Sequence, residues 1–312
     1  MTASPPTAPP QERPARRPRR PPRGRPSPAR GLVAAARPRQ WMKNVLVFAA
    51  PAAAGVLGHG DALARTLLAF VAFCLVSSAT YMLNDVVDVE ADRRHPVKRH
   101  RPVAGGVVSV RLVLATAAVL LACGLALAYA VSWKLGLLVT GYKVLTAAYT
   151  FRLKHTANVD IVVVATGFVV RAVAGGVAVG VPLSHWFLAV TSFGSLFMVA
   201  GKRQGELLRG GGAEARPVLA QYTLEHLRFV VTTSAAVTIL TYCLWAFGHP
   251  HTSSVPWWGL SIVPFVMGIM RYALLVDRGE GGSPEELIVR DPGLRLVGVT
   301  WLALFLGSVY IH

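Results

Sequence analysis

The sequence predicts an all-α integral membrane protein with about nine transmembrane helices, and three observations lead to this fold class. Of its 312 residues, 53% are hydrophobic and only 15% are charged. The apolar residues form long runs of about 20 residues, the length that an α-helix needs to cross the hydrocarbon layer of a membrane. These runs lack the alternation of apolar and polar residues that is typical of a membrane-barrel strand, and they are too long for one.

The N-terminal segment, residues 1–36, is expected to be a disordered cytoplasmic tail that precedes a membrane domain of residues 37–312. Residues 1–40 contain ten arginines, many prolines and a single acid, Glu12. Such a composition cannot bury a hydrophobic core. A basic tail can bind nucleic acid, but apolar runs follow at once and no nucleic-acid-binding motif is present, which favours anionic lipid head groups as its partner. We therefore expect contact with membrane lipids and none with nucleic acid.

The apolar runs give nine candidate membrane helices. The first of them is short and contains Pro51. The nine candidates cover residues 44–59, 64–83, 111–131, 134–151, 160–181, 184–201, 228–248, 257–276 and 294–311.

Lysine and arginine are distributed unequally between the two sides of the membrane. With the basic N-terminus in the cytoplasm, the inner loops are residues 84–110, 152–159, 202–227 and 277–293, and each of them carries basic residues. The outer connections are residues 60–63, 132–133, 182–183 and 249–256, and they contain no lysine or arginine. Because cytoplasmic loops are enriched in these residues, this orientation is favoured, and it places the polar chemistry on the cytoplasmic side.

An acidic motif follows the second predicted span. Asp85, Asp88 and Asp92 are spaced i, i+3 and i+7, so on one helix they would share a face. Three like charges at a membrane helix end are costly unless a cation neutralises them, and Mg²⁺ prefers carboxylate oxygens together with substrate phosphates. We expect these three aspartates to be catalytic and, with Asn84, to be the metal ligands. The alternative is a solvated helix end whose acids pair with nearby arginines.

Other polar residues near the same membrane face are candidates to bind a phosphorylated substrate. Arg171 lies about three turns inside the fifth span, where a guanidinium needs a carboxylate, a phosphate or water. The alternative for Arg171 is a structural partnership with an inward-facing acid. The candidate substrate-binding residues are Lys43, Asn84, Lys98, Arg101, Tyr149, Lys154, Asp160, Arg171, Lys202, Arg203 and Glu206.

The nine spans and the NDxxDxxxD pattern at residues 84–92 resemble the UbiA superfamily of intramembrane prenyltransferases. This resemblance, over residues 37–312, implies a helical bundle around a central cavity open to the cytoplasm, and a diphosphate bound through Mg²⁺ by two aspartate-rich motifs. The chain departs from the pattern after the sixth span, where residues 201–206 read GKRQGE instead of a second aspartate pair.

Several longer motifs resemble one branch of that superfamily, the decaprenyl-phosphate phosphoribosyltransferases. They are RPRQWMKN at 37–44, NDVVDVEADRRHPVKRHRPVAGG at 84–106, AYTFRLKHTANVD at 148–160, GFVVRAVAGGVA at 167–178, GKRQGE at 201–206 and PEELIVRD at 284–291. The resemblance implies a pentosyltransferase in a bacterial cell membrane that moves 5-phosphoribose from phosphoribosyl diphosphate (PRPP) to decaprenyl phosphate or a similar polyprenyl phosphate. It also implies Mg²⁺ dependence and a role in making the precursor of cell-wall arabinan, the arabinose polymer of arabinogalactan.

Two other functions stay open at this point. One is a prenyltransferase with a polyprenyl diphosphate donor and an aromatic acceptor, which the missing second aspartate pair disfavours. The other is a transporter of an anionic solute, to which Arg171 and the glycines around it would suit a broken helix. The sequence leaves open whether the chain forms a homo-oligomer.

Overall fold

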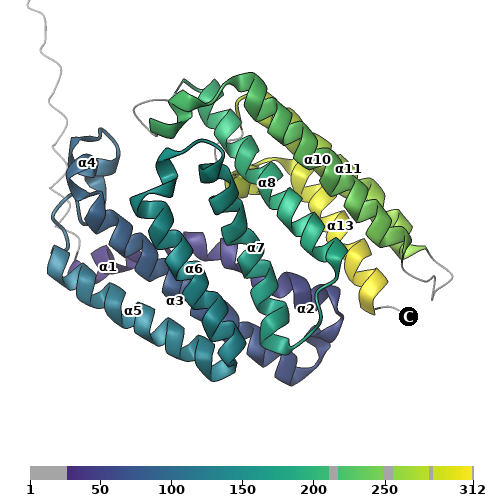
Figure 1. Ribbon diagram of the computed structural model, residues 1–312, viewed down its shortest axis with the longest axis horizontal. Coiled ribbons are helices and arrows are strands. Elements are labelled where there is room, and N and C mark those ends of the chain that lie inside the picture. The colour runs from purple at the N-terminus through teal and green to yellow at the C-terminus, as the bar shows by residue number, and fades with distance from the viewer. Residues whose placement is uncertain (1–26, 211–216, 249–255, 281–283, 311–312) are drawn as a thin grey trace, which may run out of the picture.

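The computed structural model describes residues 27–210, 217–248, 256–280 and 284–310, and every regular element in these ranges is a helix. Eight helices have 19 or more residues and form the body of the molecule (Figure 1). They are α3 (Gly60–Val87), α5 (Val110–Val131), α6 (Trp133–Phe151), α7 (Val159–Val179), α8 (His185–Leu208), α10 (Leu224–Phe247), α11 (Trp257–Asp277) and α13 (Pro292–Tyr310). The predicted all-α fold class is confirmed.

Side-chain caps fix where several of the long helices begin. Ser109, Ser132, Ser184 and Thr223 precede α5, α6, α8 and α10, and each side-chain oxygen accepts a hydrogen bond from a backbone N–H of the first turn. These caps satisfy amide groups that have no partner inside the helix. They explain why the observed helices begin within a few residues of the predicted spans.

Six of the described helices are long and apolar enough to cross a membrane, namely α3, α5, α7, α10, α11 and α13. The chain is therefore a multi-pass membrane protein. The long helices α6 and α8 fall outside this group; α6 carries Lys134 and Lys143, and α8 carries Lys202, Arg203 and Glu206. The predicted count of nine spans is not confirmed.

The first predicted span, residues 44–59, is not one helix, so this prediction is wrong. The chain there forms the 3₁₀ helix η1 (Pro38–Phe48), the short helix α2 (Ala49–Ala53) and the 3₁₀ turn η2 (Val56–Gly58). Gly55 ends α2 in the left-handed region, with φ at 71°. The backbone of η1 also lies directly against α7, since a Cβ on Gly175 would lie 1.7 Å from the carbonyl oxygen of Val47.

The long helices pack mostly in chain order. Each of α3, α5, α6, α7, α8, α10 and α11 contacts the next in this series, α11 contacts α13, and α13 returns to α2 (Figure 1). One apolar core lies among α3, α5, α6 and α7, and a second lies among α7, α8, α10 and α11. Many large apolar side chains on the outer surfaces are exposed, Leu296 and Val299 among them, as a surface facing lipid requires.

The short helix α1 (Pro28–Ala36) directly precedes η1 in the chain. α1 packs against α3 and the loop before α5, and Ala35 is fully buried there with Met82 and Val108. The expected disordered tail therefore does not extend to residue 36, because the apolar side of this segment joins a core. Residues 1–26 lie outside the described residues.

Candidate functional site

The acidic motif spans a helix break. α3 ends at Val87, Asp88 has φ and ψ of −90° and 6°, and α4 (Val89–Arg94) begins directly after it. The prediction that one continuous helix carries all three aspartates is therefore wrong. The break separates Asp85, at the end of α3, from Asp92, on α4.

Asp85 and Asp92 nevertheless meet at a shared cation. Arg101 Nη1 lies 2.7 Å from Asp92 Oδ2 and 3.4 Å from Asp85 Oδ1. Arg37 also forms an ion pair and a hydrogen bond with Asp85 Oδ1. Both carboxylates are almost fully buried, whereas the two arginine side chains are 30% exposed. The structure thus holds a buried acidic pair that two partly exposed cations cover.

The backbone at Arg37 suits this contact. Arg37 has φ at 52°, one of two non-glycine residues with positive φ in the described chain, and it joins α1 to η1. This conformation is uncommon for a residue with a side chain and is found most often where the surrounding structure requires it. It allows the guanidinium to reach Asp85 and to lie over the ring of Tyr81.

Asn84 and Asp88 face a different set of partners, on α6 and on the 3₁₀ turn η4 (Leu153–His155). Thr150 Oγ1 donates a hydrogen bond of 3.0 Å to Asn84 Oδ1, and Lys154 Nζ lies 3.5 Å from Asp88 Oδ1. The predicted ligands Asn84, Asp85, Asp88 and Asp92 are therefore not gathered around one point. Only Asp85 and Asp92 converge.

A second polar cluster lies between α6, α7 and α8. The guanidinium of Arg203 binds Asp160 through two hydrogen bonds, Nε to Oδ2 at 2.7 Å and Nη2 to Oδ1 at 3.0 Å, and both side chains are buried. Tyr149 Oη donates a hydrogen bond of 2.6 Å to Asp160 Oδ1, and Arg203 Nη1 reaches Glu206 at 3.1 Å. Three of our predicted substrate-binding residues thus hold Arg203 in place, so its charge is already neutralised.

The two clusters are joined through neighbouring residues of α6. Tyr149 contacts Asp160 on α7, and the next residue, Thr150, contacts Asn84 on α3. The end of α6 therefore fixes the distance between the acidic pair and the Arg203 cluster. Both clusters lie at the same end of the helical bundle.

Arg171 lies deeper, and neutral groups bind it. Its Nε donates to Asn44 Oδ1 at 2.8 Å, its Nη1 to the carbonyl of Gly167 at 2.6 Å and its Nη2 to Tyr142 Oη at 2.6 Å. The guanidinium also lies 4.8 Å from the centre of the Tyr142 ring. These contacts tie α7 to η1 and α6, and they differ from both functions that the sequence suggested, a phosphate contact and an ion pair with an acid.

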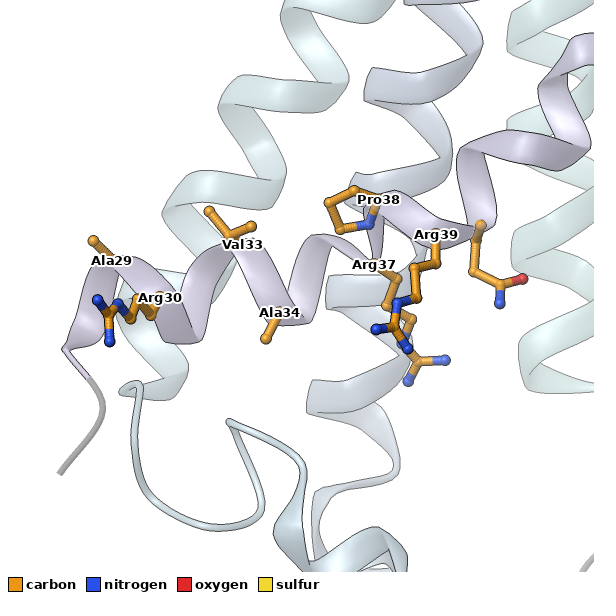
Figure 2. A pocket seen from close by; sticks show the side chains of 8 residues that line it. Ala29, Arg30, Val33, Ala34, Arg37, Pro38 and Arg39 are labelled. Carbon is orange, nitrogen blue, oxygen red and sulfur yellow. The ribbon is translucent and has the colours of Figure 1, made fainter. Parts of the chain in front are cut away.

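The remaining predicted cations lie on three different elements. Lys43 lies on η1, Lys98 on the 3₁₀ turn η3 (Lys98–His100) and Lys202 on α8, and all three are half-buried. A pocket runs along α1 and the start of η1 (Figure 2), where Arg37 and Arg39 extend to the same side. Its lining residues are Ala29, Arg30, Val33, Ala34, Arg37, Pro38, Arg39 and Gln40.

The donor groups fit a hard divalent cation. Among the described residues no three His, Cys, Asp or Glu side chains are arranged to hold a metal ion. Asp85 and Asp92 nevertheless direct carboxylate oxygens at one position, which the Arg101 guanidinium holds. Mg²⁺ is commonly bound by one or two carboxylates, with waters and substrate phosphates as the other ligands. Asp85 and Asp92 could therefore supply two carboxylate ligands to a divalent cation.

Sequence reasoning does not identify three polar residues that the structure places in these contacts. They are Arg37, which opens the RPRQWMKN motif, Thr150, and Lys143, which lies inside a predicted span. A charged residue within a membrane span commonly marks a functional site, and Lys143 carries this signal as Arg171 does. Nothing in the sequence singles out Thr150.

Comparison with known sequences gives a consistent result. Residues 45–290 match the UbiA prenyltransferase family. The chain is 48% identical over 281 residues to the decaprenyl-phosphate phosphoribosyltransferase of Mycobacterium tuberculosis, which covers 88% of this chain and 92% of that protein. It is 43% identical over 291 residues to the protein of the same name from Corynebacterium glutamicum, and the alignment covers 91% of this chain and 88% of that protein.

Comparison with solved structures concerns the fold alone, because the sequence identity is low. A UbiA homologue from Archaeoglobus fulgidus, solved with DMAPP and Mg²⁺ bound, aligns with a TM-score of 0.70 and 17% identity. The alignment covers 90% of this chain and all of that one. The helical arrangement described above is therefore that of a known membrane fold.

Proposed function

Because this chain belongs to the UbiA prenyltransferase family, we propose that its buried acidic pair serves a transfer reaction on a diphosphate substrate at the membrane. The protein is a transferase, and its relatives at 42–48% identity carry the name decaprenyl-phosphate phosphoribosyltransferase. The reaction is the transfer of 5-phosphoribose from PRPP to decaprenyl phosphate, with release of diphosphate. The lipid is then the acceptor, whereas a prenyltransferase uses a lipid diphosphate as the donor.

One observation carries this proposal: two buried carboxylates, Asp85 and Asp92, converge on the guanidinium of Arg101, and Arg37 also pairs with Asp85. The acids suit a metal–diphosphate, and the bases suit a donor that carries an additional phosphate. The position of a second acidic motif is taken by Arg203, which is neutralised by Asp160. This position therefore supplies no second carboxylate pair for a metal–diphosphate, and Arg37 and Arg101 beside the acidic pair suit a donor with one further phosphate.

Asp85 and Asp92 would hold Mg²⁺, and Asp88 is the candidate for a third carboxylate. With the ion bound, the site would neutralise negative charge that develops on the diphosphate leaving group. Arg37 and Arg101 would then be released from the two carboxylates and bind phosphate oxygens, for which guanidinium groups are suited by their paired N–H donors. Lys43, Lys98, Lys154 and Lys202 are further candidates for the phosphates.

The chain's remaining task is to orient the reactants. As the bond to diphosphate breaks, the anomeric carbon gains positive charge, and the lipid phosphate attacks it from the opposite face. A phosphate monoester is already ionised near neutral pH, so the reaction needs no strong general base. Arg203 and the end of α6 are held in place by contacts with Tyr149, Asp160 and Glu206. These fixed side chains would help to position the donor.

The location of the reaction follows from the charge distribution. The acidic pair, Lys154 and the Arg203 cluster lie at one end of the bundle, the end that bears the basic loops. Under the positive-inside rule this end faces the cytoplasm, where a soluble substrate such as PRPP would be available. A bacterial plasma membrane and a part in cell-wall arabinan synthesis complete the proposal.

The test is a reaction with purified protein in nanodiscs. PRPP labelled in the ribose, decaprenyl phosphate and MgCl₂ should yield a labelled lipid and diphosphate, and EDTA should stop the reaction. The Asp85→Asn variant is the matched inactive control. If no labelled lipid forms, and the protein instead couples a polyprenyl diphosphate to an aromatic acid, the proposed substrates are wrong.

A further inference from the structure

Lys143 is a positively charged residue in the interior of a long helix. It is the eleventh residue of α6, eight residues before the helix ends at Phe151. At 1.5 Å per residue, this places its Cα about 12 Å along the helix from that end. A lysine this far inside the helical bundle of a membrane protein is costly unless it meets an anion or water, and such residues commonly line a substrate path.

The contacts of Lys143 leave most of its charge uncompensated. Its Nζ donates one hydrogen bond of 3.1 Å, to Thr80 Oγ1 on α3. Thr80 donates its own proton to the carbonyl of Val76, so it accepts the bond from Lys143. In the described part of the chain no carboxylate forms an ion pair with Lys143. The ammonium group has three donors, and two of them have no partner in these ranges.

Arg171 provides a useful contrast. It too lacks a carboxylate partner, but Asn44, Gly167 and Tyr142 accept hydrogen bonds from its Nε, Nη1 and Nη2. Arg171 is also buried, with 6% exposed, whereas Lys143 is half-exposed. Arg171 therefore serves as a structural tie between elements, and Lys143 retains the capacity to bind an anion.

Lys143 also continues a row of polar contacts that begins at the acidic motif. Thr80, Asn84 and Asp88 occupy positions i, i+4 and i+8 of the α3 region, so they follow one face. Their partners are, in the same order, Lys143, Thr150 and Lys154. This polar row leads from the helix break at Asp88 toward the interior of the bundle and ends at Lys143.

We propose that Lys143 binds the phosphate of the lipid acceptor, an inference that rests on the proposed function. Thr80 precedes Asp85 by five residues, which corresponds to about 7.5 Å along α3 on the side away from the helix end. In an in-line displacement, the attacking oxygen and the leaving oxygen lie on opposite faces of the reacting carbon. The phosphorus atoms of the attacking and leaving groups are then on the order of 7 Å apart when the reactants are within about 3 Å. With the diphosphate at Asp85, the acceptor phosphate belongs at the depth of Lys143.

The 5-phosphate of PRPP is also a phosphomonoester, so Lys143 could in principle bind either this group or the phosphate of the lipid. The depth of Lys143 in the bundle distinguishes these two ligands. PRPP is fully water-soluble and would enter at the basic end of the bundle. The decaprenyl chain lies in the hydrocarbon layer, so the lipid would enter from the side of the bundle, with its chain extending into the bilayer. A lysine behind the acidic pair, seen from that end, therefore suits the lipid.

The experiment replaces the ammonium with an apolar chain of similar length. Lys143→Met in nanodiscs should raise KM for decaprenyl phosphate about tenfold or more, the effect of losing one charged hydrogen bond, with KM for PRPP unchanged. Lys143→Arg should restore part of the lipid affinity. Lys134→Met, at an exposed lysine near the other end of α6, is the matched control and should leave both KM values unchanged.

Other outcomes would overturn the inference. They are a raised KM for PRPP with an unchanged KM for the lipid, a change confined to kcat, or no change at all. Calorimetric titration of Lys143→Met with Mg²⁺ and PRPP verifies that the variant is folded, and if it is not, Lys143→Gln replaces it in the same assay. Absence of transfer by the wild-type protein would instead contradict the proposed function, so the two failures are separable.

Discussion

Arg101 Nη1 lies 2.7 Å from Asp92 Oδ2, and the same atom lies 3.4 Å from Asp85 Oδ1. One guanidinium nitrogen thus occupies the position where two buried carboxylates converge from opposite sides of a helix break. Without a bound cation, Asp85 and Asp92 would repel each other in a buried setting, which is unfavourable. The arginine therefore offsets this repulsion and holds the two carboxylates at one position.

Removing either carboxylate should abolish metal-dependent substrate binding. We expect Asp85→Asn and Asp92→Asn each to lower kcat/KM by about a hundredfold or more, because each eliminates a charged ligand. Calorimetric titration with PRPP in the presence and absence of Mg²⁺ measures the binding. Glu90→Gln, at an exposed acid of α4 that pairs with Arg93, is the control and should retain both binding and turnover.

Arg37 should matter for PRPP and not only for the fold. We expect Arg37→Ala to raise KM for PRPP about tenfold, because a charged contact to phosphate is lost. Arg39, two residues further along the chain, lines the same pocket and is exposed (Figure 2). Arg39→Ala should therefore change KM for PRPP by less than about twofold. Equal effects of the two substitutions would show that only the general positive charge of this segment is used.

The Asp160–Arg203 pair should contribute to stability more than to chemistry. Arg203→Met leaves Asp160 as a buried, unpaired acid, which typically costs about 3–5 kcal/mol. We expect a clear fall in the thermal unfolding temperature in detergent, and Arg203→Lys should not restore it because lysine cannot form the two-point contact. Arg209→Met, at an exposed position just after α8, should leave the unfolding temperature unchanged.

Gly175 should tolerate no side chain. The Cβ of Gly175→Ala would lie 1.7 Å from the carbonyl oxygen of Val47, so η1 would have to move away from α7. We expect a destabilisation of about 1–3 kcal/mol and a loss of activity, since η1 carries Lys43. Gly141→Ala on α6 meets no atom within 4 Å. A stable and active Gly175→Ala protein would mean that η1 and α7 are farther apart than described.

The contact between Arg271 and Asp291 should depend on pH. Hydrogen bonds from Arg271 and from the backbone of Leu294 lower the pKa of Asp291 below its usual value. The pair then stabilises the α11–α13 packing at neutral pH, and this contribution is lost as the pH falls through that lowered pKa. The difference in unfolding temperature between the wild type and Asp291→Asn should thus shrink as the buffer is taken from pH 7 to below pH 4. A difference that is constant with pH would contradict an ionic origin.

The sequence led to the family, the membrane helices and the chemical character of the site. The long apolar runs place α3, α5, α7, α10, α11 and α13 within a few residues, because a membrane helix must be apolar along its whole length. The first run was wrong for a local reason, since Gly55 and the close contact of η1 with α7 interrupt what looked like one helix. The negative charge of the acidic motif is likewise evident from the sequence, whereas the helix break at Asp88 is not.

What the sequence alone determined is the kind of protein: a multi-pass, UbiA-like membrane transferase with an acidic motif among bases. Hydropathy and the spacing of charges depend only on the order of residues, so they can be determined without a three-dimensional structure. Only the tertiary structure decided which charges meet. Arg37 and Arg101 pair with the buried acids Asp85 and Asp92. Arg203 is neutralised by Asp160. Lys143 donates one hydrogen bond, to Thr80, at the end of the polar row. These pairings join residues from different helices, and the distances between helices depend on packing, which no single segment of sequence specifies.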